Sequence, residues 1–157
     1  MQWTLTFDIT GVDWEELCTL MRRTGLGDRQ PARTQAVFAG SYACCFAWDQ
    51  TQLIGCARAI SDGVTSSAIY DVYVDPPYQG QGVGRALMAN LLSRLPRRSV
   101  MLVSTHGNEE FYRKLGFRRL RTAYILQEDF GPWAQMGYLV DEPLVAEPIS
   151  ATGSTVV

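Results

Sequence analysis

The chain has 157 residues, of which 46% are hydrophobic and 19% charged, and its formal net charge is -2 at pH 7. This length suits one domain with its own hydrophobic core and is short for two. The negative net charge argues against a general nucleic-acid-binding protein, which needs a basic face to neutralise phosphates.

Two further classes are disfavoured by simple patterns. No apolar run reaches the length of a membrane span, and the N-terminus lacks a charged leader followed by an apolar segment, so we expect a cytoplasmic protein without a membrane partner. The four cysteines form no CxxC pair and His106 is the only histidine, so we expect no metal site. The adjacent Cys44 and Cys45 should point to opposite faces of a strand.

The first part of the chain predicts a strand, two helices and then a series of strands. Asp13 is placed to cap a helix, with Glu16 three residues later, and a second helix should begin near Pro31. We predict strands at residues 3–9, 41–48 and 53–60. Consecutive strands indicate an antiparallel meander, which differs from the strict alternation of strand and helix in a doubly wound sheet.

The stretch 69–95 predicts a buried strand that leads through a glycine-rich turn into a helix. Aromatic and β-branched residues fill positions 69–74, and Pro76 and Pro77 end the strand because they cannot donate ladder hydrogen bonds. Apolar residues recur at helical spacing from Val83 onward. The first amides of such a helix have no partner within it and attract anions such as phosphate.

The spacing of this turn distinguishes between the known phosphate-binding patterns. A Walker loop would need a Lys followed by Ser or Thr, and a dinucleotide fingerprint would need a third glycine where Arg85 stands. The pattern Gln-x-x-Gly-x-Gly at Gln79, Gly82 and Gly84 instead resembles the acetyl-CoA loop of the GNAT superfamily of N-acetyltransferases. A merely structural turn is the alternative.

A second segment further along resembles the same superfamily. After a predicted strand at 99–104, Asn108 can cap a short helix, and Gly116 stands where a left-handed C-terminal residue is expected. The sequence Phe-Tyr-x-x-x-Gly-Phe, from Phe111 to Phe117, resembles the signature that closes the catalytic half of a GNAT domain.

The resemblance implies a mixed α+β fold. Its central twisted sheet would be mostly antiparallel, with one splayed parallel strand pair and about four flanking helices. We expect a GNAT domain over residues 1–140 and a flexible tail over 141–157. An aromatic cluster of Phe130, Trp133 and Tyr138 could pack on the domain or on a second subunit, so a homodimer stays open.

The resemblance also implies acetyl-CoA as the cosubstrate, without a metal. Many relatives carry an Asn seven residues before the tyrosine, whereas this chain has Thr105 there and Asn108 displaced. The cofactor-binding residues implied are Val72, Tyr73, Val74, Gln79, Gly80, Gln81, Gly82, Val83, Gly84, Arg85 and Asn108.

The chemistry implied is acetyl transfer to a primary amine by direct attack. Tyr112 would protonate the departing thiolate, and its alternative role is that of a core aromatic residue. Asp71, a carboxylate within an apolar strand, needs either a partner such as Arg58 or a function, and we assign it as the base, with a water chain as the alternative. The surroundings of Asp71 and Tyr78 are similar to those in plastid-type serotonin and arylalkylamine acetyltransferases, which suggests that Tyr78 binds substrate.

The sequence leaves the acceptor open. We expect a small-molecule amine and no nucleic acid. A protein lysine or N-terminus is one alternative. A CoA-binding sensor or scaffold without turnover is another, and an unrelated nucleotide-binding domain is a third.

Overall fold

The computed structural model describes residues 3–96 and 98–140 of the chain. The chain divides into two compact units, Met1–Arg118 and Arg119–Val157. This division precedes the predicted boundary at residue 140, which stays a prediction. The predicted tail 141–157 lies outside the described residues.

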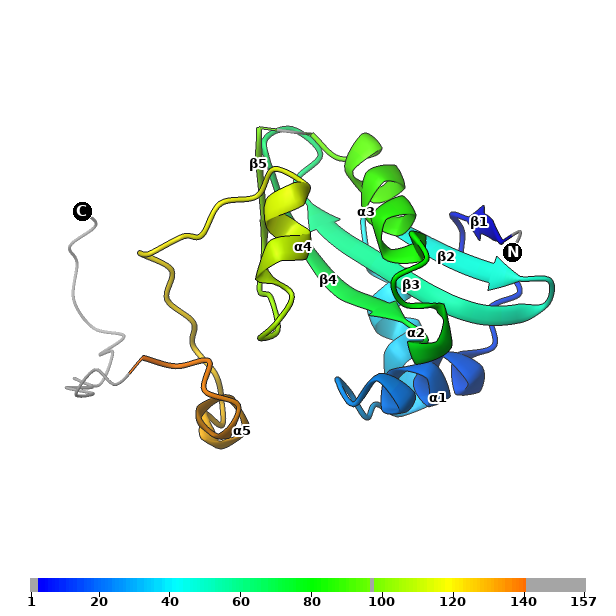
Figure 1. The fold of residues 1–157 in the computed structure, drawn as a ribbon, viewed down its shortest axis with the longest axis horizontal. Helices are drawn as coiled ribbons and strands as arrows, with labels where there is room; N and C mark the ends of the chain where they lie inside the picture. The colour runs from blue at the N-terminus through cyan, green and yellow to red at the C-terminus, as the bar shows by residue number, and fades with distance from the viewer. Residues whose placement is uncertain (1–2, 97, 141–157) are drawn as a thin grey trace. The chain divides into compact units, whose positions relative to one another are not determined.

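The first unit is a mixed sheet with helices on both faces (Figure 1). The strands lie in the order β1-β2-β3-β4-β5, antiparallel up to β4, and β5 is parallel to β4. This confirms the predicted α+β fold with one parallel strand pair. The elements are β1 Thr4–Thr6, α1 Trp14–Thr24, α2 Pro31–Ala39, β2 Ala43–Asp49, β3 Gln52–Ser61, β4 Ser66–Val74, η1 Pro76–Tyr78, α3 Val83–Ser93, β5 Ser99–Leu102 and α4 Glu109–Lys114.

The cap predicted at Asp13 located the start of α1 correctly. The Asp13 carboxylate accepts hydrogen bonds from the backbone amides of Glu15 and Glu16 at 2.9 and 3.1 Å. Glu16 does not complete the reciprocal capping box, because its own carboxylate accepts from the backbone amide of Leu53 at 2.9 Å. This side chain therefore ties the start of α1 to β3.

The first strand is shorter than predicted. Only Thr4–Thr6 pair with β2, opposite Trp48 to Phe46, although residues 3–9 alternate in polarity. The Asp8 carboxylate then accepts from the amide of Thr10 at 2.9 Å, a local turn that leads the chain away from the sheet. Alternation alone could not reveal that this side-chain bond ends the strand.

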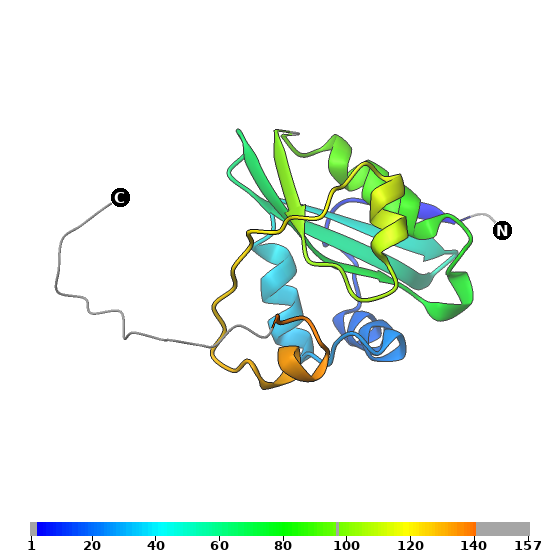
Figure 2. The ribbon, with the colours of Figure 1, turned by 60° about the vertical axis from the view of Figure 1, so that its left-hand side comes forward.

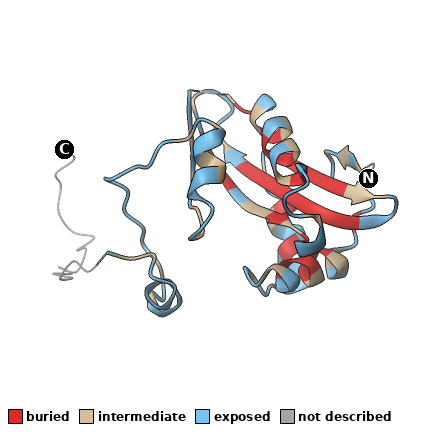
Figure 3. Cartoon of the chain, viewed as in Figure 1, coloured by how far each residue is buried: buried red, intermediate tan, exposed pale blue. Residues whose placement is uncertain are grey.

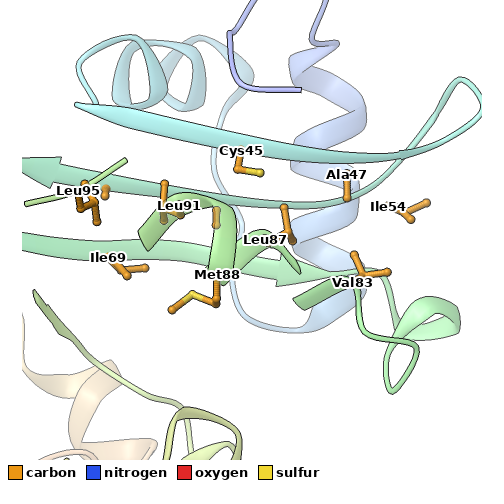
Figure 4. Packing of buried hydrophobic residues seen from close by; sticks show 11 residues of the cluster. Cys45, Ala47, Ile54, Ile69, Val83, Leu87, Met88, Leu91 and Leu95 are labelled. Atoms are coloured by element: carbon orange, nitrogen blue, oxygen red, sulfur yellow. The ribbon is translucent and has the colours of Figure 1, made fainter. Parts of the chain in front are cut away.

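Each face of the sheet carries its own apolar core (Figures 2 and 3). Helices α3 and α4 cover one face, where Val83, Leu87 and Leu91 of α3 pack on the sheet (Figure 4). Helices α1 and α2 cover the other face. Cys45 belongs to the α3 side and Cys44 to the α1 side, which confirms that the adjacent thiols point in opposite directions.

The second unit contains one short helix within its described part, residues 119–140. This helix, α5, spans Gly131–Gln135, and the rings of Trp133 and Tyr138 meet edge to face at 5.7 Å. No strand lies between residues 119 and 140. Among the residues that the structure describes, no helix combines the length and apolar character needed to cross a bilayer.

We expect Leu87→Ala to destabilise the protein by about 3 kcal/mol, because the side chain is fully buried and its loss leaves a cavity beneath α3. Chemical denaturation followed by circular dichroism measures this free energy of unfolding. The matched control is Leu126→Ala, at a side chain that is 85% exposed, which should change it by less than about 0.5 kcal/mol. Equal effects of the two variants would contradict the packing described.

Candidate active site

The turn between β4 and α3 leaves the start of the helix open. Gly80 and Gly82 have φ angles of 74° and 89°, and a Cβ atom on either would meet nothing within 4 Å. Gly82 is the N-cap of α3, and no side chain of the described residues caps that end of the helix. The free amides of the first turn therefore face open space and can bind an anion.

Two glutamines stiffen this turn from within. Gln79 donates from Nε2 to the carbonyl of Val74 at 3.0 Å, and Gln81 donates to the carbonyl of Pro77 at 2.7 Å. Their side chains are thus used in holding the turn, so the backbone amides are the donors available to a ligand.

Helix α3 also lies very close to β4 and α4. A Cβ atom at Gly84 would lie 3.4 Å from Cγ2 of Val74 and 3.5 Å from Cζ of Phe111. Arg85 and Lys114 line a small hollow together with Phe111 and Leu115. Two cations beside an uncapped helix N-terminus fit a polyphosphate group, so the residues present suit the phosphates of acetyl-CoA.

Strands β4 and β5 part beside this turn. Their pairing ends at Ile69 and Leu102, whereas β4 continues to Val74. Val72 and Val74 pack on the α3 side, and Tyr73 is buried on the other side. Within residues 3–96 and 98–140, the edge of β4 from residue 70 onward therefore has no neighbouring strand toward β5 and can accept an extended ligand.

A bulge interrupts β4 at this point. Tyr73 lies opposite Cys56 and Tyr70 opposite Arg58, so two residues of β4 oppose the single Ala57 of β3. One of the two, Asp71, has a φ angle of 53°. The bulge places Tyr70 and Asp71 on the same face of the sheet, because both contact Arg58.

The carboxylate of Asp71 is held by two arginines, which we call the arginine–aspartate cluster: Arg29, Arg58 and Asp71. Arg29 donates from Nη1 and Nη2 to the two carboxylate oxygens at 3.0 and 2.5 Å, and Arg58 donates from Nε. The alternative pairing with Arg58 is thus confirmed. Burial raises the pKa of Asp71, but the hydrogen bonds and charges of both arginines outweigh it and bring that pKa below its usual value.

Tyr112 lies on the opposite face of the sheet from Asp71. Its ring packs on the α3 core and meets the rings of Phe111 and Phe117 edge to face at 5.0 and 6.0 Å. Burial raises the pKa of its phenol. Within the described part of the chain its hydroxyl makes no hydrogen bond, which leaves the proton available to a ligand.

Two other predicted site residues are engaged with neighbours. The hydroxyl of Tyr78 donates to Asp49 at 2.8 Å, across the turn between β2 and β3. Asn108 occupies the N-cap position of α4 without capping it, because its amide donates to Oγ1 of Thr105 at 2.6 Å. The roles of both residues in binding stay predictions.

The structure brings together most of the predicted site and adds residues that the sequence did not indicate. The glycine turn, Val72, Val74 and Tyr112 border the same side of the sheet, whereas Asp71 lies on the other. No sequence pattern indicated Arg29 as a site residue, since it lies in the connection between α1 and α2 and reaches Asp71 across 42 residues of chain. Lys114 lies within the segment from Phe111 to Phe117 that resembles the GNAT signature, but only the fold places it beside Arg85.

We expect Asp71→Asn to lower the free energy of unfolding by about 3 kcal/mol at pH 7, since the change leaves two arginines without their anion. Because the pKa of Asp71 is depressed in the folded state, its contribution is complete above the unfolded value of about 3.9 and is lost on acidification through the folded value. The variant should therefore lose less stability than the wild type between about pH 5 and pH 2.

Denaturation curves over that pH range measure the difference. The control is Asp28→Asn, whose ion pair with Arg22 at 3.5 Å is exposed and should contribute less than about 1 kcal/mol. Parallel acid profiles for wild type and Asp71→Asn would show that the cluster does not stabilise the fold.

Comparison with known proteins supports the same conclusion from sequence and from structure. A family model described as an acetyltransferase (GNAT) domain matches residues 40–119, about half of the chain. A solved structure of a probable acetyltransferase from meticillin-resistant Staphylococcus aureus superposes with a TM-score of 0.71 at 25% identity, over 80% of this chain and 100% of that one.

Curated relatives match over shorter spans. Soybean histone acetyltransferase TAP1 is 46% identical over 72 residues, which are 44% of this chain and 31% of that protein. Rice chloroplastic serotonin N-acetyltransferase 2 is 32% identical over 115 residues, 69% of this chain and 58% of that protein. The matched part thus spans about a third of the first relative and over half of the second. The family model, the fold and these relatives agree that the chain belongs to the GNAT family of acetyltransferases.

Proposed function

We propose that this protein is an N-acetyltransferase that moves the acetyl group of acetyl-CoA to a primary amine of a small molecule, by direct attack in a ternary complex. The observation that carries the proposal is the uncapped N-terminus of α3, opened by Gly80 and Gly82 where β4 parts from β5. An anion-binding helix end beside an unpaired strand edge suits a cosubstrate with a pyrophosphate and an extended arm.

In this proposal the backbone does most of the binding. The amides of Val83 to Arg85 would hold the pyrophosphate, and Arg85 and Lys114 would add positive charge beside it. The open edge of β4 from Val72 to Val74 would hold the extended arm and polarise the thioester carbonyl. Acetyl-CoA supplies the activated acetyl group.

Tyr112 is the proposed acid. A tyrosine phenol is protonated at neutral pH, and burial raises the pKa of Tyr112 further; its hydroxyl has no partner among the described residues that would compete for the proton. A proton from Tyr112 would neutralise the departing thiolate. This role needs proximity more than a shifted pKa, because a thiolate is already a fair leaving group.

Asp71 stays the sequence-based candidate for the base. To abstract a proton it would have to act while accepting hydrogen bonds from Arg29 and Arg58, which make its carboxylate a weaker base. We therefore favour a water molecule as the base and assign Asp71 to holding the two arginines.

The names of the relatives suggest two kinds of acceptor. The rice relative is named for serotonin, a small amine, and the soybean relative for histones, which are proteins. We favour the small amine, because a lysine-rich histone segment calls for an acidic cleft and the arginine–aspartate cluster carries a net positive charge. A screen of acceptors should therefore include a histone peptide beside small amines.

The proposal is tested by calorimetric titration of the protein with acetyl-CoA, beside ATP and NAD, followed by a screen of amines for CoA release. We expect the protein to bind acetyl-CoA but neither ATP nor NAD, and to release CoA only when an amine is present. Binding without turnover for any amine or peptide would favour a CoA-binding sensor. Preference for ATP or NAD would contradict the assignment of the turn.

We expect Gly82→Val to abolish detectable binding of acetyl-CoA in the same titration. A side chain there would occupy the space beside the first turn of α3, and a β-branched residue is strained at a φ of 89°. The matched control is Gly25→Val at the end of α1, where φ is 71° and the space is equally open. The control should show similar strain and normal binding, so loss of binding in both variants would point to misfolding.

We expect Tyr112→Phe to lower kcat by about 100-fold, the lower end for general acid catalysis, while the Kd for acetyl-CoA stays within about twofold. Steady-state kinetics and calorimetry measure the two quantities. Tyr42→Phe removes a hydroxyl from a tyrosine that is 51% exposed and serves as the control. Unchanged kcat in Tyr112→Phe would remove this residue from the mechanism.

A further inference from the structure

The arginine–aspartate cluster has an excess of positive charge in a mostly buried place. The side chains of Arg29, Arg58 and Asp71 are 23%, 10% and 8% exposed. Two guanidinium groups share one carboxylate, so the cluster carries a net charge of about +1. Among the described residues, neither Arg29 nor Arg58 forms an ion pair with a carboxylate other than that of Asp71. A positive charge with this little solvent and no further anion is unfavourable unless a ligand offsets it.

The two arginines differ in what they can still bind. The guanidinium of Arg58 lies over the rings of Tyr70 and Phe38, at 5.0 and 5.9 Å, and its Nη1 donates to Ser41 at 3.4 Å. Aromatic rings and hydrogen bonds therefore enclose Arg58.

Arg29 keeps a free edge. It binds Asp71 end-on through Nη1 and Nη2. Its Nε and the outer hydrogens of the terminal nitrogens make no other hydrogen bond among the described residues. The edge formed by Nε and the adjacent terminal nitrogen has the spacing that binds a carboxylate through two parallel hydrogen bonds.

The position of Arg29 matters for the reaction proposed above. Asp71 directly precedes Val72, along which the acetyl group would lie, and the bulge turns Tyr70 and Asp71 toward the face opposite α3. The ring of Tyr70 is 44% exposed there. Helices α1 and α2 cover part of this face, but Tyr70 and some of Arg29 stay exposed on it, so the second substrate can reach the gap between β4 and β5 from their side.

We propose that the acceptor is a primary amine that also carries a carboxylate, and that Arg29 binds this carboxylate. The inference rests on the proposed N-acetyltransferase function and names its substrate class. A plain ammonium ion would be repelled by the cluster, whereas an amine with a carboxylate brings the missing anion. The same positive charge favours the neutral form of the bound amine, which is the form that attacks the thioester.

The test compares amines that differ only in a carboxylate, by CoA release at saturating acetyl-CoA. Suitable pairs are tyramine and tyrosine, tryptamine and tryptophan, and propylamine and γ-aminobutyrate, which cover two spacings between amine and carboxylate. We expect the carboxylated member of at least one pair to have a kcat/KM at least tenfold higher.

Variants then assign the preference to Arg29. Arg29→Gln should raise KM for the carboxylated amine at least tenfold while changing the KM for acetyl-CoA less than twofold, and Arg29→Lys should fall between, since it keeps the charge and loses the fork. The control, Arg33→Gln, makes the same change at an exposed arginine of α2 without a partner among the described residues, and should behave as wild type.

The outcomes separate this inference from the function on which it rests. Equal or better use of the plain amines by the wild type would overturn the inference and leave the N-acetyltransferase function standing. An equal rise in KM for both members of a pair in Arg29→Gln would do the same. Absence of CoA release with every amine would overturn both. The wild-type comparison needs no variant, so poor folding of Arg29→Gln would not prevent a decision.

Discussion

Hydrophobic packing of α3 on the sheet is the interaction on which the candidate site depends. Val83 is both the first residue of the helix and a core residue with 1% exposure, so the anion-binding end of α3 cannot shift without exposing the core. Gly55 permits this close approach, because a Cβ atom there would lie 2.9 Å from the carbonyl of Tyr73 and 3.0 Å from Leu87. A nonpolar contact thus positions the candidate polar binding site.

Strand β4 separates two environments of different character. On one side, Val72, Val74 and Tyr112 form an apolar surface beside the start of α3, which suits an extended arm and a thioester. On the other side, the bulge exposes Tyr70 and orients Asp71 toward two arginines. Replacing such a buried ion cluster by apolar packing is often neutral for stability, although removing one partner alone is costly, and our proposal assigns this cluster a role in recognition.

Membership of the GNAT family accounts for the apolar side of β4 next to α3 better than for the side that carries Asp71 and the two arginines. The relatives share the acetyltransferase domain, yet their names refer to acceptors as different as histones and serotonin. Family resemblance therefore predicts the cosubstrate side and leaves the acceptor side open. Our proposal for the acceptor therefore rests on the charges and contacts of the face that carries Arg29 and Tyr70.

Short-range rules within the sequence determined much of this protein. The cap at Asp13, the start of α2 at Pro31, the end of β4 before Pro76 and the left-handed Gly116 all follow from sterics and hydrogen bonds between near neighbours. The same rules located the glycine turn and the order of strands and helices, whereas the family was indicated by the resemblance of two motifs to those of GNAT proteins.

Only the tertiary structure decided the contacts between distant residues. The shift in register between β3 and β4, the pairing of Asp71 with Arg29, and the engagement of Tyr78 with Asp49 each join segments far apart in the chain. The end of the first compact unit at Arg118 also depends on which segments pack together. Local propensities cannot specify such contacts, because burial and geometry select the partner of a charged or aromatic side chain once the sheet and helices have assembled.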